Sequence, residues 1–170
     1  MWDLSGKQIL TFNHYGYRSI AEFVGFSTDG KYVLTGRCDK PDKIWDLEGQ
    51  EINYFIGQRN FVTSVSYSPD GKSVLTGSGD GMARIWDLSA RRIQTITGHE
   101  YEVMSAVFSP DGKYVLTGSG DGTAKIWDLQ GRNIQSFNGD EDGVNSVAFS
   151  PDGQLVLIGD ATYGTAQLLN

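Results

Sequence analysis

Three residues of this chain have the types needed for nucleophilic catalysis: Thr117, His99 and Asp121. A hydroxyl that a histidine activates, with a carboxylate orienting the histidine, can attack an acyl group. A buried structural network uses the same types, because Asp accepts hydrogen bonds while His and Thr can both donate and accept them. The hydroxyl and carboxylate recur at Thr76 and Asp80 without a histidine, which catalysis would not permit. We therefore expect no enzyme, with hydrolase-like chemistry at Thr117 as a distant alternative.

Metal and cofactor sites are not indicated either. Two His and one Cys cannot assemble a credible zinc site. The many Asp-Gly pairs lack the alternating carboxylates and distal Glu of a calcium loop, and turn geometry explains them better. There is no phosphate-binding loop and no Gly-x-Ser-x-Gly elbow. The sequence therefore predicts neither a metal nor a cofactor.

Composition and charge argue against several classes of partner. The net charge is −7, and no cluster of Lys and Arg is present to displace the counterions of nucleic acid. No stretch approaches the roughly 18–20 apolar residues of a membrane helix. Trp2 follows the first residue without a basic or apolar leader, and the single Cys38 suits a reducing compartment. We expect a cytoplasmic protein that binds neither nucleic acid nor membrane.

Four copies of one segment position the residues discussed above. Each copy carries Trp-Asp-Leu, and the tryptophans Trp2, Trp45, Trp86 and Trp127 are 43, 41 and 41 residues apart. Leu169 stands where a fifth would fall. A repeat of this length with several short strands is typical of a propeller blade.

The third repeat shows the strands most clearly. Residues 92–96 alternate apolar and polar, as does a strand with one buried face. Residues 103–108 form a more continuous apolar run, and two further strands follow at about 114–118 and 123–127, separated by Asp-Gly turns. The other repeats follow the same plan. The predicted fold is all-β, a propeller of four-stranded antiparallel blades.

These repeats resemble the WD-repeat β-propeller family, and the resemblance covers essentially the whole chain. The third repeat runs from Gly98-His99 to Trp127-Asp128, as a family repeat does. The Ser-Pro-Asp-Gly and Thr-Gly-Ser-Gly-Asp-Gly segments look most like bacterial members with many repeats. We expect one domain, residues 1–170, with blades at about 20–55, 61–96, 103–137 and 144–170.

The resemblance implies a buried network in each blade that joins a loop His, a strand Thr, a turn Asp and the repeat Trp. The fourth repeat has Asp140, Ile158 and Leu169 in place of His, Thr and Trp, so its blade is expected to be the least rigid. The matching residues elsewhere are His99, Thr117, Asp121 and Trp127 in the third repeat, Thr76, Asp80 and Trp86 in the second, and Thr35, Asp39 and Trp45 in the first.

The resemblance also implies a protein-interaction scaffold, with an unknown protein or peptide bound on the loop rim around the central channel. Phe61 and Met104 are the expected anchors, because aromatic and Met side chains carry much interface energy. Phe61 could equally well pack under its own loop. Glu22 and Glu102 would favour a basic peptide. The predicted rim residues are Ile20, Glu22, Cys38, Phe61, Thr63, Glu102, Met104 and Asn145.

A spare outer strand, about 7–12, precedes the first blade, whereas the last blade lacks one. In the family an N-terminal strand completes the C-terminal blade and hides its edge, a closure likened to velcro. Two chains joined head to tail would give a homodimeric eight-bladed ring, with Ile9 and Phe12 of each chain packing on the other. Trp2 and Leu169 claim the same strand position, so we expect Trp2 to be displaced. The alternatives are a four-bladed monomer or a fragment of a longer WD-repeat regulatory protein.

Overall fold

The computed structural model describes residues 1–12, 21–37, 42–55, 60–139, 142–160 and 166–169. These residues form fifteen strands in four antiparallel sheets, with no helix among them, which confirms the predicted all-β class. Consequently, no helix in the described ranges could cross a membrane.

Each sheet is one blade, and its strands pair in chain order. Blades 1 to 3 have four strands and blade 4 has three. Blade 1 contains β1 (Ala21–Phe26), β2 (Tyr32–Arg37), β3 (Lys43–Asp46) and β4 (Glu51–Tyr54). Blade 2 contains β5 (Val62–Tyr67), β6 (Ser73–Ser78), β7 (Ala83–Asp87) and β8 (Arg92–Ile96). Blade 3 contains β9 (Val103–Phe108), β10 (Tyr114–Ser119), β11 (Thr123–Asp128) and β12 (Asn133–Asn138), and blade 4 contains β13 (Val144–Phe149), β14 (Val156–Asp160) and β15 (Ala166–Leu169).

The turn between the first two strands has the same construction in every blade. In blade 2, Ser68 Oγ donates to Asp70 Oδ1 (2.7 Å) and accepts the N–H of Ser73 (2.9 Å), and Gly71 has a φ of +69° that glycine adopts without strain. The equivalent contacts recur in the other blades. The residue five positions after the turn serine therefore has the same backbone setting throughout; these residues are Tyr32, Ser73, Tyr114 and Leu155.

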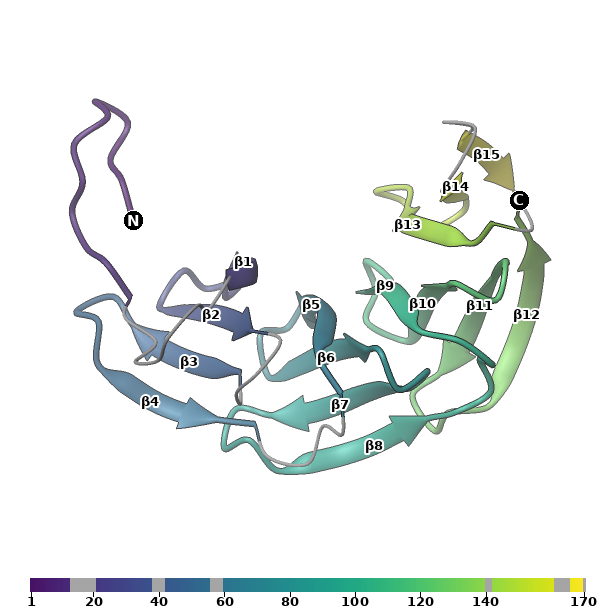
Figure 1. Ribbon diagram of the computed structural model, residues 1–170, viewed down its shortest axis with the longest axis horizontal. Coiled ribbons are helices and arrows are strands. Elements are labelled where there is room, and N and C mark those ends of the chain that lie inside the picture. The colour runs from purple at the N-terminus through teal and green to yellow at the C-terminus, as the bar shows by residue number, and fades with distance from the viewer. Residues whose placement is uncertain (13–20, 38–41, 56–59, 140–141, 161–165, 170) are drawn as a thin grey trace.

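The four blades stand side by side in an open arc (Figure 1). The first strand of each blade, β1, β5, β9 or β13, lies along the concave side, and the outer strands β4, β8 and β12 lie along the convex side. The N-terminal segment and blade 4 occupy opposite ends of the arc. In this structure the single chain does not close into a four-bladed ring.

The hydrophobic core lies between blades. Between blades 2 and 3, Leu75 and Ile85 of one blade pack with Ala106, Val115 and Trp127 of the next, and all are buried. Similar clusters join blades 1 and 2 and blades 3 and 4. Each blade thus has one apolar face for the preceding blade and another for the following blade.

The two ends of the arc each leave one such face uncovered. Leu157 of blade 4 is 43% exposed, although the equivalent Leu116 of blade 3 is fully buried. At the other end, Val24 and Phe26 of blade 1 are 71% and 59% exposed, whereas Ala106, equivalent to Val24, is 1% exposed. We call the Leu157 surface the trailing face and the Val24–Phe26 surface the leading face.

Residues 1–12 reproduce the hairpin formed by the third and fourth strands of a blade. Trp2 pairs with Gln8, as Trp45 pairs with Glu51. The rings of Phe12 and Trp45 lie 5.7 Å apart with an interplanar angle of 53°, close to the 5.2 Å and 56° of the interblade pair formed by Phe55 and Trp86. The N-terminal hairpin therefore lies where half of a preceding blade would lie, and in the single chain Trp2 is paired rather than displaced.

Candidate functional site

A chain of hydrogen bonds crosses blade 3 from β11 to the loop that precedes β9. Trp127 Nε1 donates to Thr117 Oγ1 (2.8 Å), and this hydroxyl lies 2.7 Å from His99 Nε2. His99 Nδ1 lies 2.8 Å from Asp121 Oδ2. The structure thus brings together the four network residues expected in this repeat.

Asp121 fastens the loop to the neighbouring turn. Besides His99, it accepts hydrogen bonds from the Glu100 N–H (3.1 Å), the Thr123 N–H (3.0 Å) and the Thr123 hydroxyl (2.6 Å). Burial alone raises the pKa of Asp121, but the hydrogen bonds from Thr123, His99 and Glu100 outweigh it and lower the pKa to about 2. The carboxylate is therefore ionised at neutral pH, and it holds the loop that contains His99 against the turn that contains Asp121 itself.

A neutral His99 satisfies all of these contacts. Its Nδ1–H donates to Asp121 while Nε2 accepts the Thr117 hydroxyl hydrogen, a tautomer assigned from the network. Burial lowers the pKa of His99 more than the Asp121 carboxylate raises it. The Thr117 hydroxyl is fully buried and already engaged by His99 and Trp127, so it is not presented to a substrate. The triad geometry here is that of a structural link.

In blade 2 an arginine, instead of a histidine, binds the turn carboxylate, and the sequence did not predict this contact. Trp86 Nε1 still donates to Thr76 Oγ1 (2.9 Å), but Asp80 forms two hydrogen bonds with Arg84, at 2.6 and 3.1 Å. The Arg84 side chain is only 4% exposed. Burial raises the pKa of Asp80, but Arg84, together with hydrogen bonds from Ser78 and the Met82 N–H, outweighs burial and lowers the pKa. The available signal was the absence of His at position 58, which leaves the turn carboxylate of Asp80 in need of another hydrogen-bond donor.

In the first and last blades, only part of the network falls on residues that the structure describes. In blade 1, Trp45 Nε1 donates to Thr35 Oγ1 (2.7 Å), while Asp39 lies outside the described residues. In blade 4, the register pairs Val156 with Leu169, as Val115 pairs with Trp127 in blade 3. The fully buried Ile158 stands where Thr117 stands in blade 3, and Asp140 is outside the described residues. Thr and Trp are thus replaced together by two aliphatic residues.

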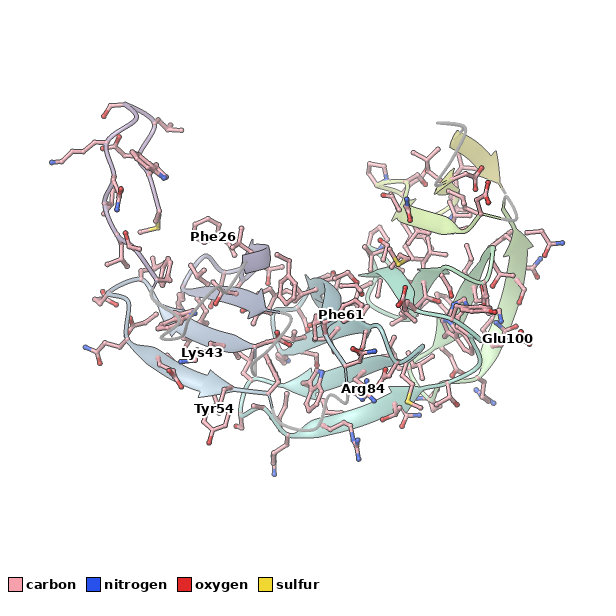
Figure 2. All side chains as sticks on the ribbon, in the orientation of Figure 1. Phe26, Lys43, Tyr54, Phe61, Arg84 and Glu100 are labelled. Carbon is pink, nitrogen blue, oxygen red and sulfur yellow. The ribbon has the colours of Figure 1, made fainter. Side chains whose placement is uncertain are left out.

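The rim residues divide into packed and exposed side chains. Phe61 is half-buried over Gly79, where an added Cβ would lie 2.8 Å from its ring, and Figure 2 shows it near the concave edge. Thr63 donates to the Val103 carbonyl across the blade boundary, and Met104 is half-buried. Glu102 and Asn145 are exposed. Ile20, Cys38 and the Glu22 side chain fall outside what the structure describes.

Comparison with known proteins agrees with this architecture. The family model described as WD domain, G-beta repeat matches residues 49–87, 90–128 and 131–167, more than half of the chain. No curated protein matches the chain. Repeats of this family generally serve as scaffolds for protein interactions. The chain belongs to the WD40 repeat family.

Proposed function

We propose that this chain is a protein-interaction scaffold that works as a homodimeric eight-bladed ring. The observation that carries the proposal is the pair of uncovered apolar faces at the ends of the arc. Leu157 and Phe26 are large apolar residues left 43% and 59% exposed. Their repeat equivalents within the arc, Leu75 and Phe108, lie in or against the core between blades 2 and 3. Exposed apolar patches of this kind mark interaction surfaces.

The trailing and leading faces match each other by repeat symmetry. Leu75 of blade 2 packs in the same cluster as Ala106 and Phe108 of blade 3. Leu157 of one chain would meet Val24 and Phe26 of a second chain in the same way. Two head-to-tail contacts would then close the arc and leave no free sheet edge. Further blades of a longer chain could fill the same faces, and the experiment below separates these cases.

The replacement of Thr and Trp by Ile158 and Leu169 in blade 4 indicates which strands would pair at the proposed contact between chains. If the partner's Trp2 entered the third-strand position, its indole N–H would face Ile158 instead of a hydroxyl. A buried donor without an acceptor costs about 1–3 kcal/mol. We infer that β15 stays in place and that residues 7–12 of the partner pair with it. The segment Met1–Asp3 must then give up its bridge to Gln8 and its backbone hydrogen bonds with Lys7, Ile9 and Leu10, which the new pairing with β15 would have to offset.

Solution mass tests the ring. Light scattering of the 170-residue chain should give about twice 18.7 kDa. Replacing Ile9 and Phe12 together with Lys should give a single-chain mass or aggregation, because the outer strand could no longer pack on the neighbouring blades. A wild-type mass near 18.7 kDa contradicts the dimer. If a longer parent protein contains the same arc and has the mass of one chain, its own additional blades cover the trailing and leading faces.

The loop rim is the proposed surface for a partner. Phe61→Ala with Met104→Ala should weaken binding of a lysine-rich peptide at least about tenfold, as expected for anchor residues. Fluorescence anisotropy of the labelled peptide measures this change. Tyr101→Ala is the matched control, since Tyr101 is 65% exposed on a neighbouring loop and is not a predicted anchor. Equal affinity of the double variant and the wild type would remove Phe61 and Met104 from the site.

A further inference from the structure

One position in the repeat is large in three blades and small in the remaining one. Tyr32, Tyr114 and Leu155 occupy it in blades 1, 3 and 4, and Ser73 occupies it in blade 2. The turn serine binds the backbone N–H at this position in all four blades, at 2.9–3.0 Å. The backbone is therefore held alike, and the difference lies in the side chain alone.

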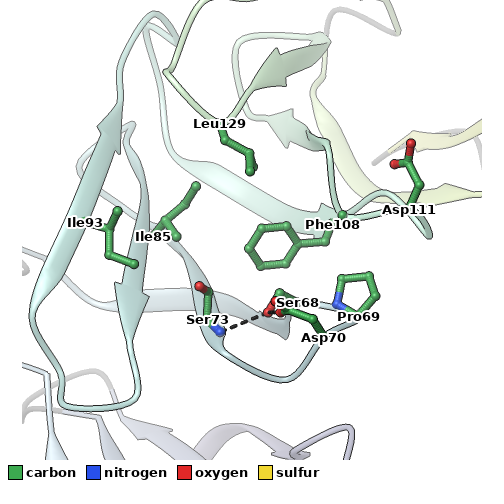
Figure 3. Close-up of a pocket in the computed structure, with 10 residues that line it drawn as sticks. Ser68, Pro69, Asp70, Ser73, Ile85, Ile93, Phe108, Asp111 and Leu129 are labelled. Carbon is green, nitrogen blue, oxygen red and sulfur yellow. Dashed lines mark hydrogen bonds between the residues drawn. The ribbon is translucent and has the colours of Figure 1, made fainter.

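The missing side chain leaves a hollow between blades 2 and 3. Between blades 1 and 2, Tyr32 and Tyr67 both pack against the core. At the next junction, where Phe108 is equivalent to Tyr67, the structure has a partly open cavity of about 470 Å³ lined by Ser73 and Phe108. This volume is in the range of ligand pockets, roughly 300–1,000 Å³. Ile85, Ile93 and Leu129 complete its apolar wall (Figure 3).

Two carboxylates from adjacent blades also line the cavity. Asp70 and Asp111 each accept a hydrogen bond from a turn serine, and this contact lowers the pKa of both, that of Asp111 to about 2. Both are ionised at neutral pH. Lys72 and Lys113 pair with them, but these lysine side chains are 82% and 74% exposed, and exposed pairs contribute little. A cation from a partner can therefore take their place.

We propose that this cavity binds an aromatic side chain of a partner protein whose neighbouring residue is Lys or Arg. The aromatic ring would occupy the space that Tyr32 fills one blade earlier and would contact Phe108. The adjacent cation would contact Asp70 and Asp111. This site lies at a junction within the arc, away from the loop rim and from both end faces, so it stands independently of the proposed ring.

The probe is the peptide acetyl-Arg-Tyr-Lys-amide, titrated into methyl-labelled protein and followed by NMR. Saturable shifts are expected for the methyl groups of Ile85, Ile93 and Leu129. Ser73→Tyr should raise the dissociation constant at least about tenfold by filling the cavity. This variant should fold, because Tyr occupies the equivalent position in blades 1 and 3. Ile93→Lys is a second test, since Ile93 is 57% exposed and the new charge would repel the peptide.

Two control peptides separate the contributions of ring and charge. Acetyl-Arg-Ala-Lys-amide and acetyl-Glu-Tyr-Glu-amide should each bind at least about tenfold more weakly. Tyr32→Ser should create a second site and add shifts at Ile44, Ile52 and Leu88, the equivalents in blades 1 and 2. The proposal is overturned if no lining methyl group shifts, if Ser73→Tyr binds with unchanged affinity, or if the acidic peptide binds equally well.

Discussion

Replacing Asp80 with alanine should lower the free energy of unfolding by about 3–5 kcal/mol, the cost of leaving one member of a buried ion pair alone. Arg84 is held by two hydrogen bonds to Asp80, and its side chain is 4% exposed. Its Nε has no partner among the described residues. The variant would leave a buried guanidinium without its counter-charge in the middle of the arc.

Urea denaturation followed by tryptophan fluorescence measures this loss. Asp70→Ala is the matched control, because Asp70 is an exposed turn aspartate and its loss should cost much less. The double variant Asp80→Leu with Arg84→Met should recover most of the stability, since apolar residues of similar volume replace buried ion pairs at little cost. A loss below 1 kcal/mol in the single variant would show that Arg84 reaches water once Asp80 is gone.

The second large effect concerns assembly. Leu157→Asp should convert the proposed dimer to single chains, raising its dissociation constant at least about a thousandfold. In the ring, the new carboxylate would be buried without a partner at each of two junctions. In the single chain, Leu157 is 43% exposed, so the substitution should change folding stability by only about 0.5 kcal/mol.

Light scattering over a range of protein concentrations reads out the dimer. Ile134→Asp is the matched control, because Ile134 is 53% exposed on the outer strand β12 and belongs to neither end face. The control should keep the dimer mass. If Leu157→Asp keeps it as well, or if both variants lose it equally, the trailing face is not the contact between chains.

The repeated landmarks were enough to predict the blades. Asp-Gly turns and alternating apolar residues appear at the same phase in each copy, and the family resemblance then points to the hydrogen-bonding residues around His99. Arg84 was not predicted as the partner of Asp80, because its repeat position has no common role. Its equivalents make other contacts: Lys125 Nζ donates to the Gly98 carbonyl, and Lys43 contacts Glu51. Two features of the sequence distinguish Arg84, namely an Arg where its equivalents are Lys and the missing histidine of its repeat, and both signals are indirect.

Exposure at the ends of the arc could not be read from residue types. Leu116 and Leu157 are the same residue at the same repeat position, and only a neighbouring blade makes one buried and the other exposed. Ser73, in contrast, differs in residue type from its repeat equivalents. Its contrast with Tyr32 is visible in the aligned repeats, but the cavity follows only once the structure shows that both backbones are held alike.

Having both uncovered faces on one chain has a consequence for affinity. In a two-chain ring the same contact forms twice, and once the first has formed, the second closes at a high effective concentration, on the order of millimolar for tethered sites. Avidity of this kind lets two individually weak contacts hold a ring firmly, because dissociation needs both to be open at once. A single damaged face on each chain would then remove the whole benefit, leaving chains that meet only transiently.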